Sequence, residues 1–227
     1  MLRLAVLALG LAVPAAPAVA ACRLALVLAL DVSSSVDGRE DRLQRDGLAA
    51  ALIADDVVAA ILSQPDFVVA LNVFEWSGRD EQVPVLGWTQ LSSRADIEGA
   101  AAAIAASTRR SDDFPTALGS AMGYASTLFP SGPACERKVI DVSGDGKNNA
   151  GYGPESAYRY FPFDGVTVNA LAIGGRLEDL PGYYRRTLIR GPGAFVEEAE
   201  DYSDFVVAMT RKLIRETAAP ELSRLGD

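Results

Sequence analysis

The sequence predicts an α/β protein in which a doubly wound, mainly parallel central sheet is flanked by helices on both faces. Short apolar runs of strand length alternate along the chain with longer segments of helical spacing, as βαβ units require. The apolar runs contain few polar residues, which is typical of parallel strands buried on both faces. With 227 residues, 49% of them hydrophobic, the chain can bury the core of one domain.

Each element follows from its local pattern. The apolar run Leu24–Leu30 is too short for a typical helix and is followed by polar residues, which indicates a strand. Residues 38–62 have helical spacing and are predicted as one helix. The remaining predicted elements are strands at 66–76 and 81–91, a helix at 94–107 capped by Ser92 or Ser93, a helix at 116–129, strands at 137–145 and 164–175, a short strand within 193–199, and a helix from Asp201 or Ser203 to near Thr217.

The first twenty residues have the pattern of an export signal. Arg3 is followed by an apolar stretch, and Ala18-Val19-Ala20 forms an A-x-A cleavage site. Prolines interrupt the stretch, which is shorter than the roughly 20 residues that a membrane span needs. We therefore expect a cleaved signal peptide at 1–20, a mature domain at 21–217 without a transmembrane segment, a flexible tail at 218–227, and a periplasmic or secreted location.

Cys22 would lie near the new N-terminus after cleavage, and two roles are open for it. Val19–Cys22, "VAAC", resembles the bacterial lipobox, in which the cysteine carries a lipid anchor. A disulfide to Cys135 is the other role, since disulfides form in oxidising, exported compartments.

Composition excludes several classes of function. The chain contains no histidine, which rules out a Ser-His-Asp triad, a Cys-His nucleophile pair and a histidine-based zinc site. Two cysteines are too few for a thiolate metal cage. The net charge of −9, from 30 acidic and 21 basic residues, repels phosphate backbones, so we expect no binding to nucleic acid.

Oxygen-bearing side chains follow two of the predicted strands. Asp31, Ser33 and Ser35 come after the first strand, and Asp145 lies in the turn "DVSGDG". If the two strands are neighbours, both turns share one edge of the sheet, where such folds bind ligands. Carboxylates and hydroxyls are hard donors that suit Mg²⁺, Mn²⁺ or Ca²⁺. A D-x-S-x-S run alone also fits a simple strand-to-helix turn with serine caps.

The combination of three motifs resembles the von Willebrand factor A domain and its metal-ion-dependent adhesion site. "DVSSS" supplies Asp31, Ser33 and Ser35, "TALGSAM" supplies Thr116 at the start of a helix, and "VIDVSGDG" supplies Asp145. Within that family the chain looks closest to exported bacterial proteins of unknown function, through "DVSSSVD", "EWSG", "VIDVSGDGKNN", "YYRR" and "GPGAFV". Ser34 replaces a glycine common in the family, at a position that is not expected to be a ligand.

The resemblance implies a function as well as a Rossmann-like fold. It implies a divalent cation, Mg²⁺ or else Mn²⁺ or Ca²⁺, held directly or through water. One coordination position would stay open for an acidic side chain of a partner protein. The chain would then be a protein-binding module and not an enzyme. The implied ligands are Asp31, Ser33, Ser35, Thr116 and Asp145.

The resemblance also bears on the cysteines. The strand order of the family places the first strand beside the strand at 137–145. Cys22 lies nine residues before Asp31 and Cys135 ten before Asp145, so the cysteines would lie at nearly the same level. This favours the disulfide over a lipid anchor at Cys22.

Two other functions compete with metal-dependent binding. An aspartate after the first strand also resembles haloacid-dehalogenase phosphatases, but these need a second aspartate where the chain has Ser33, and Lys147 is a poor match for their lysine. The other alternative is a structural domain whose metal site is never occupied. Several further residues have predicted structural roles: Glu75 as a hydrogen-bond partner, Asn148 and Asn149 as turn formers, Asp112 and Asp113 as solvated loop residues, and Trp88, Tyr183 and Tyr184 as packing residues.

Overall fold

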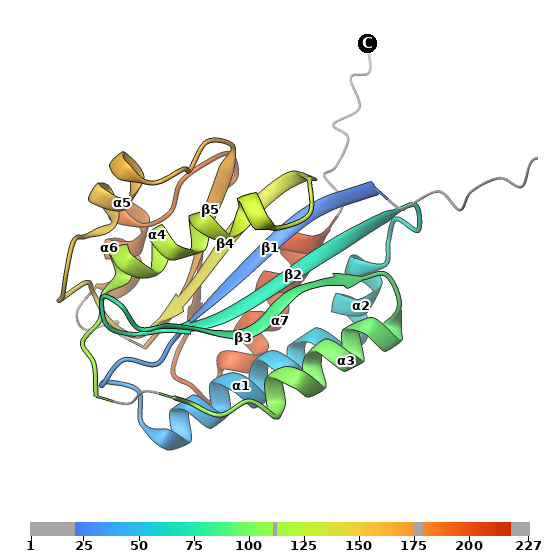
Figure 1. The fold of residues 1–227 in the computed structure, drawn as a ribbon. Coiled ribbons are helices and arrows are strands. Elements are labelled where there is room, and N and C mark those ends of the chain that lie inside the picture. Colours follow the sequence, from blue (N-terminus) through green and yellow to red (C-terminus); the bar gives the residue numbers. More distant parts are fainter. Residues whose placement is uncertain (1–20, 111–112, 175–178, 219–227) are drawn as a thin grey trace, which may run out of the picture.

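A computed structural model describes residues 21–110, 113–174 and 179–218, and its centre is a six-stranded sheet (Figure 1). The strands are β1 (Ala21–Asp31), β2 (Phe67–Trp76), β3 (Gln82–Leu91), β4 (Cys135–Gly144), β5 (Val166–Ile173) and β6 (Val196–Ala199). Their order is β3-β2-β1-β4-β5-β6; β3 is antiparallel to β2 and the other pairs are parallel. The predicted mainly parallel sheet is confirmed.

Helices cover both faces of this sheet, as Figure 1 shows. They are α1 (Gly38–Ile53), α2 (Asp55–Ile61), α3 (Arg94–Ala105), α4 (Leu118–Leu128), α5 (Pro154–Tyr160), α6 (Leu180–Thr187) and α7 (Phe205–Thr217). The first three and α7 lie on one face, and α4, α5 and α6 on the other. Leu26 and Leu28 of β1 face the first layer, whereas Ala25 and Val27 face the second, because side chains alternate along a strand. Among the described residues, none of these helices is long and apolar enough to cross a membrane.

The helices differ from the prediction in several places, and α7 begins at Phe205, after both of its predicted starts, Asp201 and Ser203. The segment 38–62 is two helices, because Ala54 has an extended ψ of 135° and Asp55 begins a new first turn. Val57, Val58 and Ile61 stay in the core, so the apolar spacing continues across the break. Helix α4 begins at Leu118, two residues after its predicted start. The short helices α5 and α6 were not predicted.

The two cysteines form a disulfide. Cys22 of β1 pairs in register with Cys135 of β4, and their Cα atoms are 4.5 Å apart. The adjacency of these two strands is the one that the resemblance implied. Because the Cys22 sulfur is bonded to Cys135, it has no thiol for a lipid.

A buried ion cluster attaches α7 to the sheet. The Lys212 Nζ atom lies 3.1 Å from Asp141 Oδ1 and 3.2 Å from Glu216 Oε1, and all three side chains are buried. Asn169 of β5 donates to Glu216 Oε1 at 2.7 Å. Burial, and then the charge of Glu216, raises the pKa of Asp141 to about 7 against the opposing effect of Lys212. One cation thus holds two carboxylates in a dry layer between helix and sheet.

Candidate metal centre

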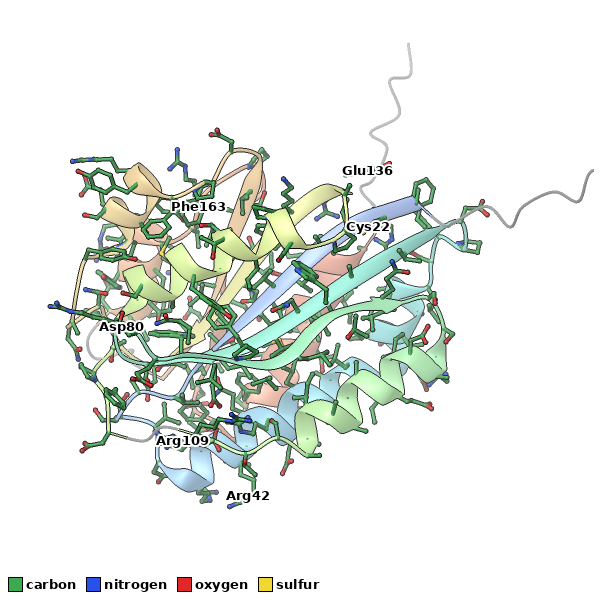
Figure 2. The ribbon with its side chains drawn as sticks, viewed as in Figure 1. Cys22, Arg42, Asp80, Arg109, Glu136 and Phe163 are labelled. Carbon is green, nitrogen blue, oxygen red and sulfur yellow. A yellow bond between two sulfur atoms is a disulfide. The ribbon has the colours of Figure 1, made fainter. Side chains whose placement is uncertain are left out.

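The five predicted ligands converge at the carboxyl ends of β1 and β4. These strands are neighbours, yet the chain leaves β1 for β2 on the other side, so the strand order reverses here. Ligands bind at such points in open α/β sheets. Figure 2 shows Asp80 and Arg109, from two loops, at this end of the molecule, and Cys22 at the other end.

Asp31 is the last residue of β1 and its carboxylate is fully buried. One oxygen, Oδ1, accepts the backbone N–H of Ser33 at 2.8 Å. The other, Oδ2, has no hydrogen-bond partner among the described residues. Burial, and then the negative charge of Asp145, raises the pKa of Asp31 to about 7. An unpartnered carboxylate oxygen in such a place is costly unless a cation or donor meets it.

A series of three hydroxyls leads to the second carboxylate, that of Asp145. Thr116 Oγ1 donates to Ser33 Oγ at 3.2 Å, and Ser33 Oγ lies 3.2 Å from Ser35 Oγ. Ser35 Oγ donates to Asp145 Oδ1 at 2.7 Å. Burial raises the pKa of Asp145, while the hydrogen bond from Ser35 opposes that shift. Three loops therefore bring two carboxylates and three hydroxyls together.

Asn148 and Asn149 fix the position of Thr116. The Asn149 side chain accepts the Thr116 N–H at 2.8 Å, and its own N–H donates to Thr116 O at 3.0 Å. Asn148 Oδ1 accepts the N–H of Gly119, in the first turn of α4, at 3.2 Å. The amide oxygens of Asn149 and Asn148 accept the N–H groups of Thr116 and Gly119. Because these donors are satisfied, Thr116 stays in the loop before α4. The two asparagines therefore position a site residue in addition to forming the turn.

Two tyrosines were missed as neighbours of the site. The buried Tyr184 hydroxyl donates to Gly146 O at 3.0 Å, beside Asp145. A side chain at Gly144 would meet this hydroxyl at 2.8 Å and Asp31 Oδ2 at 2.9 Å, so glycine is required here. The buried hydroxyl of Tyr202 is close enough to lower the pKa of Asp145, but lies outside hydrogen-bond geometry. In the sequence nothing distinguishes these tyrosines from packing residues.

Arg109 holds the loop after β1, a role that the sequence did not indicate. Its guanidinium donates to Val32 O and Val36 O, at 2.7 Å each, and to Ser33 O at 3.2 Å. On the other side of the loop, Gln44 of α1 donates to Asp31 O at 2.9 Å. The backbone that presents Ser33 is thus fixed by two side chains.

Glu75 has the structural role that we predicted. Its carboxylate forms a buried ion pair with Arg45 and accepts the N–H of Arg110 at 3.1 Å.

Asp113 is exposed, as expected, and Asp112 lies outside the described residues. Trp88 is half-buried and donates to Leu128 O at 3.2 Å. In the described part of the chain, neither Glu75, Asp113 nor Trp88 has a hydrogen bond with the five converging side chains.

The donor set fits a hard divalent cation. Beside Asp31, which has an orphaned carboxylate oxygen, lie four other oxygen-bearing side chains, and three of these four carry neutral hydroxyls. No cluster of three or more carboxylates or thiolates that suits a metal occurs within the described part of the chain, so a site here depends on the hydroxyls. A cation held by two carboxylates keeps much of its charge for a further anionic ligand.

Solved structures of a mussel byssus matrix protein and of a bacterial von Willebrand factor type A protein are similar to this fold. Proximal thread matrix protein 1 from the mussel byssus is 20% identical, with a TM-score of 0.62, over 87% of this chain and 47% of that one. A structure of the same protein has a zinc-occupied MIDAS motif (TM-score 0.58, 17% identity, 86% and 48% covered). A von Willebrand factor type A protein from Catenulispora acidiphila has a TM-score of 0.54 at 19% identity, over 87% and 42% of the two chains. The chain thus spans less than half the length of these proteins, and at such identity the similarity shows the fold alone.

A match to a family model, at the level of sequence, assigns the chain to a family. No curated protein matches the chain. Residues 21–221 match the family described as "Protein of unknown function (DUF1194)", which is nearly the whole chain. With the fold just compared, the chain belongs to the DUF1194 family of unknown function and has the fold of the von Willebrand factor A domain.

Proposed function

We propose that the mature chain is an exported protein-binding module that captures an acidic side chain of a partner protein through a bound divalent cation. The proposed ligands, direct or through water, are Asp31, Ser33, Ser35, Thr116 and Asp145. The observation that carries the proposal is the unpartnered, buried Oδ2 of Asp31 beside four other converging oxygen donors.

The chain's own residues prepare the site for this task. Ser35 and Asp145 are hydrogen-bonded to each other, and Asn149 orients Thr116. Arg109 holds the backbone of the serine loop, so little ordering remains to be done when a ligand arrives. When bound, Mg²⁺, Mn²⁺ or Ca²⁺ would supply an electrophilic position for a carboxylate. Zn²⁺ belongs in the same tests because a similar fold has a zinc-occupied site.

Export is part of the proposal. Residues 1–20 would be removed as a signal peptide, leaving 30 acidic and 20 basic residues, a net charge of −10. The disulfide between Cys22 and Cys135 suits an oxidising compartment, the periplasm or the exterior. We propose binding and not catalysis, because Ser33 stands where a phosphatase of the alternative class needs its second aspartate.

Calorimetry of the mature protein with Mg²⁺, Mn²⁺, Ca²⁺ and Zn²⁺ tests the site. We expect saturable binding of one ion, lost in Asp31→Ala and Asp145→Ala but kept in Asp113→Ala, which removes an exposed carboxylate. Partner capture should then be reversed by EDTA. If no ion binds at millimolar concentration, the metal-dependent mechanism is wrong and the domain has a structural role. Hydrolysis of a generic phosphate ester that depends on Mg²⁺ and Asp31 would support the phosphatase alternative instead.

A further inference from the structure

A second surface lies at the end of the molecule opposite the metal centre. There, β4, β5, the loop at 190–193 and the end of α7 line a groove of about 590 Å³. Figure 2 places Glu136, one of its lining residues, near Cys22 and away from Asp80 and Arg109. Four cationic residues are among those that line this groove: Arg137, Lys138, Arg190 and Arg215.

The groove carries charges of both signs. Among the described residues, none of the four cationic side chains takes part in a salt bridge. Three carboxylates also line the groove, those of Glu136, Asp164 and Glu216. Glu216 is already bound by Lys212 and Asn169. Four cationic and three acidic residues thus line the groove, an excess of one positive charge in a chain whose net charge is −9.

Two of the arginines lie against aromatic rings, of which Phe195 lines the groove and Tyr158 lies outside its lining. The Arg215 Cζ atom lies 3.7 Å from the centre of the Phe195 ring, and the Arg190 Cζ atom lies 4.7 Å from that of Tyr158. The backbone N–H of Val168 donates to Arg190 O at 2.8 Å, and the backbone N–H of Arg190 donates to Val168 O at 3.0 Å. Stacking occupies the face of a guanidinium and leaves its in-plane N–H donors available, in the geometry that binds a carboxylate with two hydrogen bonds.

We propose that this groove binds an acidic peptide segment of a partner protein, independently of the metal centre. Positive charge in an otherwise acidic protein selects an anionic ligand, and it steers that ligand to this end of the molecule. Three largely buried apolar residues, Phe163, Val166 and Phe195, also line the groove. They can contact the side chains of a peptide, whereas a free phosphate has no group to place on them. The inference does not depend on the proposed metal-dependent function.

Fluorescence anisotropy of a labelled peptide of alternating glutamate and leucine, added to the mature, disulfide-bonded protein, tests the proposal. We expect binding that weakens as ionic strength rises to about 0.15 M, that persists in EDTA, and that is absent for the matching glutamine peptide. The double variant Arg190→Gln and Arg215→Gln should lose affinity by at least about fivefold. Arg42→Gln with Arg94→Gln removes the same charge from exposed positions on α1 and α3 and should leave affinity within about twofold.

A gain of affinity is expected as well. Asp164 is exposed at the groove, so Asp164→Asn removes a repulsive charge without emptying the core and should tighten peptide binding.

Equal losses in both arginine pairs would show that only the net charge matters, and would overturn the proposal. Competition by inorganic phosphate at the peptide's own concentration would identify a small-anion site. Loss of binding in EDTA would place the peptide on the metal centre, and concentration-dependent self-association in low salt would identify a second copy as the ligand; each of these results contradicts the proposal.

Discussion

The Ser35 hydroxyl donates a 2.7 Å hydrogen bond to the Asp145 carboxylate, across 110 positions of the sequence. The bond joins the loop after β1 to the loop after β4. Both residues are proposed ligands, so the contact brings two halves of the site together before an ion binds. It also counters the rise in the pKa of Asp145 that burial causes.

Replacing Ser35 by alanine should weaken metal binding by at least about tenfold, because it removes one donor and frees Asp145. Stability should change little, since Ser35 is exposed. Calorimetry with Mg²⁺ measures the effect. Ser34→Ala is the matched control: its side chain is also exposed and is not a predicted ligand, so its metal affinity should equal that of the wild type. Equal behaviour of the two variants would remove Ser35 from the ligand set.

Asp31→Asn should stabilise the metal-free protein at neutral pH. The folded-state pKa of Asp31 is raised from 3.8 to about 7, so its stabilising contribution is present below pH 3.8 and is lost as the pH rises through about 7. Asparagine stays neutral throughout. The melting temperature of the variant should therefore exceed that of the wild type at pH 8, by a margin that shrinks toward pH 5. Mg²⁺ should raise the melting temperature of the wild type and not that of the variant.

Gly144→Ala should disrupt the site through two specific contacts. The new Cβ would lie 2.8 Å from the Tyr184 hydroxyl and 2.9 Å from Asp31 Oδ2. We expect weakened metal binding with the helical circular dichroism of the wild type. Tyr184→Phe removes one of the two clashing atoms, so the double variant should be more stable than Gly144→Ala alone. If Gly144→Ala binds metal like the wild type, the close approach has no role at the centre.

Lys212→Met should destabilise the fold by about 3–5 kcal/mol, because it leaves two buried carboxylates without their cation. The loss should be smaller at pH 5, where Asp141, with its pKa raised to about 7, is protonated. Urea denaturation at pH 5 and 8 measures both effects. The triple change Lys212→Met, Asp141→Asn and Glu216→Gln removes the charges together and should recover much of the loss. A loss independent of pH would show that packing dominates.

Reduction of the disulfide should cost about 4–5 kcal/mol in the chain-entropy account, since the closed loop is long, with a sequence separation of 113. Urea denaturation of the Cys22→Ser, Cys135→Ser variant, compared with the oxidised wild type, measures the cost. The wild type with reductant should match the variant. An equal midpoint for oxidised protein and variant would contradict this prediction.

The fold could be predicted from the sequence where burial decides the pattern. The run from Leu24 to Leu30 is buried on both faces, and a parallel strand in the centre of a sheet requires that. Helices α5 and α6 escaped prediction because they have only seven and eight residues, too few to repeat an apolar spacing. The helix break at Ala54 was not predicted for another reason. The core accepts Val57 and Ile61 from a second helix as readily as from a continued one.

The candidate site also has a part that could be predicted from the sequence and a part that could not. Asp31, Ser33, Ser35, Thr116 and Asp145 could be named because each lies at a motif with fixed spacing, and the structure brings them together. The residues that hold them could not be assigned that role, since Asn148 and Asn149 were expected only to form a turn. Arg109 and Tyr184 reach the site from distant segments, and their contacts depend on how loops and helices pack. No local pattern records such contacts.

The position of the disulfide affects how the two carboxylates of the metal centre are placed relative to each other. Cys22 lies nine residues before Asp31, and Cys135 ten before Asp145, which is about 30 Å of extended chain in each strand. A slip of one residue between β1 and β4 would displace the two carboxylates by about 3.3 Å relative to each other and turn alternate side chains to the opposite face. The covalent bond forbids that slip. The disulfide at one end of the molecule thus adds to the backbone pairing of β1 with β4 in keeping the oxygen donors at the other end in register.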